Sequence, residues 1–157
     1  MNRFFFARLT LAAMCIVMCI ALAAAQKAQE QREEQREKES NAVRTNNLAD
    51  AALANVPDKA RARTNPFEND PQAIAAGGKL FEQHCAECHG EKAGGIRPGT
   101  SLLRDPTQQA APGTLFWIIT NGVVRHGMPV WSKLPEPERW QIVTFLKTLH
   151  PQSMPPK

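Results

Sequence analysis

Two cysteines and a histidine stand close together near the middle of the chain, as Cys85-Ala86-Glu87-Cys88-His89. Thiols at this spacing can each form a thioether bond to a vinyl group of a haem, and the imidazole that follows is placed to reach the iron. The C-x-x-C-H pattern therefore predicts covalent attachment of one haem c, an iron cofactor, through Cys85 and Cys88. It also predicts His89 as an axial ligand.

Two other uses of a C-x-x-C pair fit the rest of the chain less well. A structural zinc site takes four ligands, and the remaining cysteines, Cys15 and Cys19, lie in an apolar N-terminal run. A zinc site that combines Cys85 and Cys88 with two of the four histidines stays open as an alternative. A dithiol redox pair is expected beside alternating strands and helices, a pattern that this sequence lacks.

The 157-residue chain has room for one ordinary domain with extensions, and its net charge of +4 is unevenly spread. Residues 1–65 hold ten Lys or Arg against seven Asp or Glu, whereas residues 66–157 hold nine against eight. The part that carries the cysteine pair is therefore nearly neutral. No nucleic acid is expected as a partner, because basic clusters interleaved with stacking aromatic residues are missing.

Residues 1–25 are typical of an export signal. Arg3 and Arg8 flank the start of the run from Leu9 to Ala25, which has 17 residues without a charge and ends in small residues that suit a signal peptidase. An uncleaved membrane anchor is the alternative, because about 20 apolar residues span a bilayer. Both alternatives predict an exported, periplasmic protein, and the second adds a membrane tether at the N-terminus.

Residues 26–69 are expected to form a charged, flexible tether. Residues 26–40 are almost all charged or amide side chains, which favour a solvated helix or a disordered segment over a packed one. The stretch that follows is rich in Ala, Asn and Asp and is interrupted by Pro57 and Pro66.

The haem domain is predicted over residues 70–150, as an all-α fold followed by a disordered tail at 151–157. Its first helix begins at Asn69, Asp70 or Pro71 and ends at His84. Its second begins at Pro112 and ends at Asn121-Gly122, and its third runs from about Pro135 to Leu149.

The first and third helices are expected to pack together. The third carries an apolar stripe at i, i+3, i+4 and i+7 from Ile142 to Leu149, which needs an apolar partner. Gly77 and Phe81 supply that partner, and Gly77 marks a place where another backbone can come close, at a cost of about 1 kcal/mol relative to Ala in a helix.

Two segments without periodic pattern are expected to contact the cofactor. The segment Gly90–Pro106 holds four of the chain's nine glycines and is predicted to be a loop around one edge of the haem. The segment Val123–Trp131 has no regular pattern, and within it Met128 stands between Gly127 and Pro129. In a chain that binds haem, a methionine on such a rigid loop is expected to be the second axial ligand, which raises the reduction potential.

Together these features resemble a class I monohaem c-type cytochrome over about Asp70 to Leu149. The motifs that carry the resemblance are C-x-x-C-H, Gly77-x-x-x-Phe81, Met128-Pro129 and the C-terminal helix with Ile142 and Phe145. The resemblance implies a small helical fold around one haem. It assigns the thioether bonds to Cys85 and Cys88 and the axial positions to His89 and Met128. It also implies that the carbonyl of Pro98 accepts a hydrogen bond from the ring of His89.

The function expected from this resemblance is transfer of single electrons between a redox protein donor and an acceptor outside the cytoplasm, without enzymatic activity. One alternative is a fixed haem subunit of a periplasmic dehydrogenase or oxidase. Another is a haem peroxidase or sensor, in which His126 would act near a vacant iron position.

Overall fold

The computed structural model describes the backbone of residues 3–149 and the side chains of Met18 and residues 20–149. These residues fall into two compact units, 1–41 and 42–157. Helix α1, Arg3–Ala54, contributes to both units, and only its last turns belong to the second.

The described side chains of the first unit bury no apolar surface against another element. All side chains from residue 20 to residue 40 are exposed, and Lys38 donates a hydrogen bond of 2.6 Å to Glu34 one turn earlier. Most side chains of residues 1–25, the predicted signal or anchor, lie outside the described residues. Within the described residues, no helix combines the length and apolar character required to cross a membrane.

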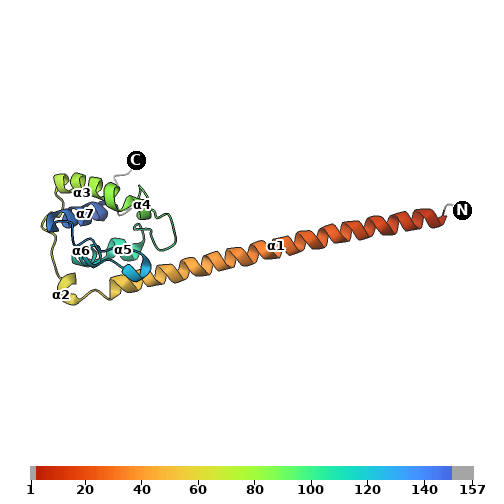
Figure 1. Cartoon of the computed structure of the whole chain (residues 1–157), viewed down its shortest axis with the longest axis horizontal. Helices are drawn as coiled ribbons and strands as arrows, with labels where there is room; N and C mark the ends of the chain where they lie inside the picture. The colour runs from red at the N-terminus through yellow and green to blue at the C-terminus, as the bar shows by residue number, and fades with distance from the viewer. Residues whose placement is uncertain (1–2, 150–157) are drawn as a thin grey trace. The chain divides into compact units, whose positions relative to one another are not determined.

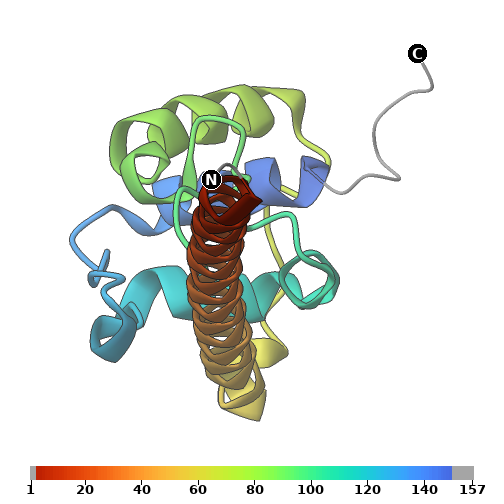
Figure 2. The ribbon, with the colours of Figure 1, turned by 90° about the vertical axis from the view of Figure 1, so that its right-hand side faces the viewer.

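The second unit is all-α among its described residues, which confirms the predicted fold class. Helix α7 lies between α3 on one side and α6 on the other, as both views of the ribbon show (Figures 1 and 2). The elements that follow α1 are α2 Asp58–Arg61, α3 Pro71–His84, α4 Ala86–His89, α5 Asp105–Gln109, α6 Pro112–Asn121, the 3₁₀ helix η1 Val124–His126, and α7 Glu136–Thr148.

Proline marks the start of four of these helices, at the first or second position of α3, α5, α6 and α7. Proline fits there because its missing N–H would have no partner inside the helix. Helix α3 has a side-chain cap as well, since Asp70 accepts hydrogen bonds from the backbone N–H groups of Gln72 and Ala73 at 2.8 and 3.3 Å.

The crossing of α3 and α7 depends on Gly77. A Cβ atom at this position would lie 2.0 Å from the carbonyl oxygen of Gln141 and 3.0 Å from Cβ of Phe145. One turn further along α3, the rings of Phe81 and Phe145 pack with centroids 5.4 Å apart. The predicted contact between the first and third helices is thus confirmed.

The opposite side of α7 is held by aromatic stacking. The rings of Phe116 in α6 and Trp140 in α7 stack at a centroid distance of 4.1 Å. The guanidinium of Arg63 lies 4.4 Å from the centre of the Phe116 ring and forms an ion pair with Glu136 at 2.5 Å. The chain before α3 therefore takes part in the packing of the domain.

The three predicted helices are confirmed, but the connections hold more structure than expected. The predicted loop Gly90–Pro106 ends at residue 104, because Pro106 takes the second position of α5. The segment predicted to be irregular contains η1 and an isolated antiparallel bridge between Val123 and Met128. Five-residue and three-residue elements are too short to give a periodic signal.

We expect Gly77→Ala to lower the free energy of unfolding by about 2–3 kcal/mol, because the added methyl group would push α7 away from α3. Gly78→Ala is the matched control, since its Cβ would lie 3.4 Å from the Phe145 ring, an ordinary contact. Helix propensity favours Ala by about 1 kcal/mol at both positions. Chemical denaturation of both variants is the measurement, and equal stabilities would contradict the role given to Gly77.

Candidate haem site

The cysteine pair and His89 are brought together by a single turn of chain. Cys85 ends α3, and its carbonyl oxygen accepts hydrogen bonds from the backbone N–H groups of Cys88 and His89 at 3.1 and 2.9 Å. This turn orients all three side chains toward one cavity. The structure therefore brings together the three residues of the motif, as the sequence predicts.

The cavity has a volume of about 390 Å³ and a mainly apolar lining. Volumes from about 300 to 1,000 Å³ are usual for sites that bind cofactors and other small molecules. Helices α3, α6 and α7 supply its apolar wall through Phe81, Leu115, Ile119, Ile142 and Leu146.

The ring of His89 has a defined tautomer. Its Nδ1 atom lies 2.6 Å from the carbonyl oxygen of Thr100, which can only accept, so Nδ1 must carry the proton. The lone pair of Nε2 is then free for a metal ion. Burial lowers the pKa of His89, although the Thr100 carbonyl acts in the opposite direction, and the ring is thus held neutral as a ligand requires.

The acceptor for His89 differs from the expected one. The resemblance assigned this hydrogen bond to the carbonyl of Pro98, whereas the structure assigns it to Thr100, two residues later. The reason is a tight turn at residues 96–100, in which the hydroxyl of Thr100 accepts from the N–H groups of Ile96 and Arg97 at 3.1 Å each and donates to the carbonyl of Arg97 at 2.7 Å. The turn aims the Thr100 carbonyl at the ring.

Cys85 does not have the lowered thiol pKa that is typical of a reactive redox pair. Burial, with a smaller contribution from Cys88, raises the pKa of Cys85 to about 11, so its thiol is protonated at neutral pH. Reactive dithiols depend on a lowered thiol pKa instead. Among the described residues, no three His, Cys, Asp or Glu side chains gather into a metal-binding group.

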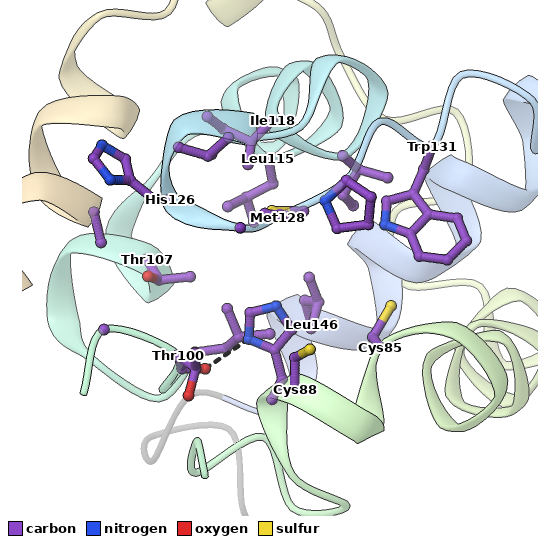
Figure 3. Close-up of a pocket in the computed structure, with 18 of the residues that line it drawn as sticks. Cys85, Cys88, Thr100, Thr107, Leu115, Ile118, His126, Met128, Trp131 and Leu146 are labelled. Carbon is purple, nitrogen blue, oxygen red and sulfur yellow. Dashed lines mark hydrogen bonds between the residues drawn. The ribbon is translucent and has the colours of Figure 1, made fainter. Parts of the chain in front are cut away.

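Met128 projects into the cavity from the side opposite Cys88 and Thr100 (Figure 3). It is held by a paired backbone, since the N–H of Val123 donates to the Met128 carbonyl at 3.0 Å and the reverse bond measures 3.3 Å. Gly127 makes the turn with φ +86°, and at Gly122, with φ +68°, a Cβ would lie 2.6 Å from the Pro129 carbonyl. The loop thus fixes where the thioether points.

Two other histidines lie at the edge of the cavity. His126 is exposed and lies on the side of the cavity away from Trp131 (Figure 3). His84 is half-buried, and its ring packs against Trp131 with centroids 5.2 Å apart.

Sequence reasoning missed one part of the lining, the end of α1. Ala49, Ala52 and Leu53 line the cavity, and Val56, which follows the helix, is 3% exposed. These four residues have the spacing i, i+3, i+4 and i+7, a signal that could have been found in the sequence. Because alanine is only weakly apolar, this pattern does not stand out within residues 26–69, for which the sequence predicts a tether.

The residues present fit a haem. Two thiols lie at the rim of an apolar cavity, a neutral imidazole presents a free nitrogen, and a thioether lies on the opposite side. These are the donor types of c-type haem sites, and the soft sulfur of methionine suits iron in this setting.

Comparison with known proteins gives the same assignment. Residues 72–146 match the family model described as cytochrome c oxidase, cbb3-type, subunit III. The chain contains a monohaem c-type cytochrome domain. A domain of this kind carries covalent haem c with its iron and serves in electron transfer.

Two curated relatives contain related cytochrome sequence. The chain is 32% identical over 93 residues to cytochrome c550 of Pseudomonas aeruginosa, which covers 54% of this chain and 61% of the relative. It is 37% identical over 75 residues to the quinohemoprotein alcohol dehydrogenase ADH-IIG of Pseudomonas putida, which covers 46% of this chain and 10% of that enzyme. The chain therefore spans less than two thirds of either relative. No solved structure is a significant match.

We expect Thr100→Val to lower the free energy of unfolding of the cytochrome by about 1–2 kcal/mol, because the N–H groups of Ile96 and Arg97 lose their acceptor. Thr100→Ser keeps the hydroxyl and is expected to stay within about 0.5 kcal/mol of the parent protein. Denaturant titration of the haem-loaded proteins measures the difference. A valine variant as stable as the serine variant would show that the turn at residues 96–100 does not depend on this hydroxyl.

Proposed function

We propose that the domain passes single electrons between redox proteins outside the cytoplasm, through a haem held by Cys85 and Cys88 and ligated by His89 and Met128. The observation that supports the proposal is an apolar cavity lined by His89, whose Nε2 is free, into which Met128 projects from the side opposite Cys88 and Thr100 (Figure 3). The haem iron, when bound, supplies a one-electron change between its ferrous and ferric states.

Each residue of the proposed site contributes to the one-electron change at the iron. Cys85 and Cys88 hold the cofactor by covalent bonds, so it is not lost on reduction or oxidation. The Thr100 carbonyl keeps the ring of His89 in one orientation and increases the basicity of the nitrogen that faces the iron. With Met128 as a second protein ligand beside His89, the iron would offer no site for a substrate and would need little rearrangement on electron transfer.

The apolar wall contributes to the reduction potential. The side chains of Phe81, Leu115, Ile119, Ile142 and Leu146 give the cavity an apolar wall. A low-dielectric surrounding disfavours the additional positive charge of ferric iron, and methionine ligation acts in the same direction. Both effects favour a potential high enough to accept electrons from many donors.

The location outside the cytoplasm is supported by the sequence of residues 1–25. In this proposal, the segment directs export and is then cleaved or retained as an anchor, and residues 26–41 separate it from the cytochrome domain. A role as an exported carrier is compatible with the similarity to cytochrome c550.

A second candidate is a fixed haem subunit of a dehydrogenase or oxidase complex. It is favoured by the similarity to the alcohol dehydrogenase, in which the matching part makes up only 10% of a larger protein. Purification of the protein from its native membrane and soluble fractions separates the two candidates, because a fixed subunit travels with a larger assembly and a shuttle does not.

We expect Met128→Ala to lower the reduction potential and to remove the long-wavelength absorption band that a sulfur ligand gives to ferric haem. Added imidazole should bind the variant more tightly, because the position across from His89 is then open. Val130→Ala is the control, since Val130 is 48% exposed on the same loop. A Met128→Ala protein with the parent spectrum and potential would exclude Met128 as a ligand.

Mass spectrometry of the protein purified from its native host tests the covalent bonds and the signal together. We expect the mass of one haem added to the chain in the parent protein and no addition in the Cys85→Ala, Cys88→Ala variant. A mass that lacks residues 1–25 identifies a cleaved signal, and the full mass identifies an anchor. A parent protein without added haem would contradict the proposed function.

A further inference from the structure

The last turns of α1, residues 42–54, lie outside the segment that matches the cytochrome family model, yet they face the haem cavity. Ala49, Ala52 and Leu53 line the cavity together with residues of the cytochrome domain. The ribbon of α1 runs on the same side of the cavity as His126, away from Cys85 and Trp131 (Figure 3).

This part of α1 is anchored to the loop that carries the acceptor for His89. Asp50 and Arg104 form an ion pair at 2.8 Å, and their side chains are only 34% and 25% exposed. Gly99 lies so close to Thr45 that a Cβ atom there would come within 2.5 Å of the Thr45 methyl group. Both contacts hold α1 against the segment that includes Thr100.

The chain that follows α1 is anchored as well. A Cβ atom at Gly113, in α6, would lie 2.3 Å from the Ala60 carbonyl, so α2 and α6 meet backbone to backbone. The amide of Asn65 donates a hydrogen bond of 2.9 Å to the hydroxyl of Thr144 in α7, and both side chains are buried. These contacts, together with those of Thr45 and Asp50, hold residues 42–54 against the rest of the domain.

We propose that residues 42–54 form one wall of the haem site and help to set the reduction potential. The proposal rests on the proposed function, because it takes haem to be the occupant of the cavity. Small side chains at 49 and 52 let the helix backbone come close to the cofactor, and Leu53 seals the wall against water. The haem-binding unit would then begin near residue 42 instead of near residue 70.

The proposal predicts that the reduction potential of the haem responds more strongly to a charge on the cavity-facing side of α1 than to a charge on its exposed side. A charge at Ala52 would act through the apolar cavity, where screening is weak, whereas a charge at exposed Asn47 would act through solvent. A negative charge stabilises ferric iron and lowers the potential, and a positive charge raises it.

The test compares four full-length variants, Ala52→Asp, Ala52→Lys, Asn47→Asp and Asn47→Lys, by redox titration with spectral detection. We expect the difference in potential between the Asp and Lys variants to be about two to four times larger at 52 than at 47. The Asp-to-Lys difference at one position cancels general disturbance of the helix. If the variants at 52 do not accumulate, the same pair of substitutions at Ala49 replaces them, with the same expectation.

Equal differences at the two positions would overturn the proposal, because a wall of the site cannot behave like a solvent-exposed surface. The outcome is separable from failure of the proposed function, since every variant must first show one covalent haem by mass and the absorption of a Met-ligated iron. Loss of those signals in the parent protein refutes the proposed function. If every variant shows both signals and the Asp-to-Lys differences in potential are equal at the two positions, only the proposed role of residues 42–54 is refuted.

Discussion

The contact between Gly77 and the carbonyl of Gln141 determines the geometry of the haem site. The backbones of α3 and α7 meet there without a side chain between them, so the two helices can neither slide nor rotate by much. Cys85 is reached two turns later along α3, and the cavity-lining residues Ile142 and Leu146 follow directly along α7. One close contact therefore positions both the attachment site and the apolar wall that faces it.

The cavity also explains why the cofactor belongs to the fold. Without the cofactor, the apolar side chains around this space of about 390 Å³ would stay exposed to water, and the stabilisation from their burial would be lost. A chain of this size has little core to offset the loss, so a covalent haem supplies apolar surface that the residues alone do not provide.

Local signals in the sequence were sufficient for the three main helices of the domain and for Cys85, Cys88, His89 and Met128 as residues of the cavity. Proline and Asp70 define where helices start, glycine after Asn121 defines where α6 ends, and C-x-x-C-H with Met128 defines two sides of the site. The partner of His89 was not predictable in the same way. A backbone carbonyl leaves no trace in residue type, and whether residue 98 or residue 100 reaches the ring depends on the path of a glycine-containing turn. The end of α1 was missed because its alanines follow a long charged stretch and do not form a clear apolar pattern.

The prolines at the starts of four helices limit how far these helices can extend into the segments that connect them. Proline has no N–H to donate, and its ring clashes with the carbonyl group four residues earlier in a helix, so α3, α5, α6 and α7 cannot lengthen backward by much more than a turn. The segments that connect these helices therefore resist winding into helix. Such connections help the domain to keep its spacing around a rigid, disc-shaped guest.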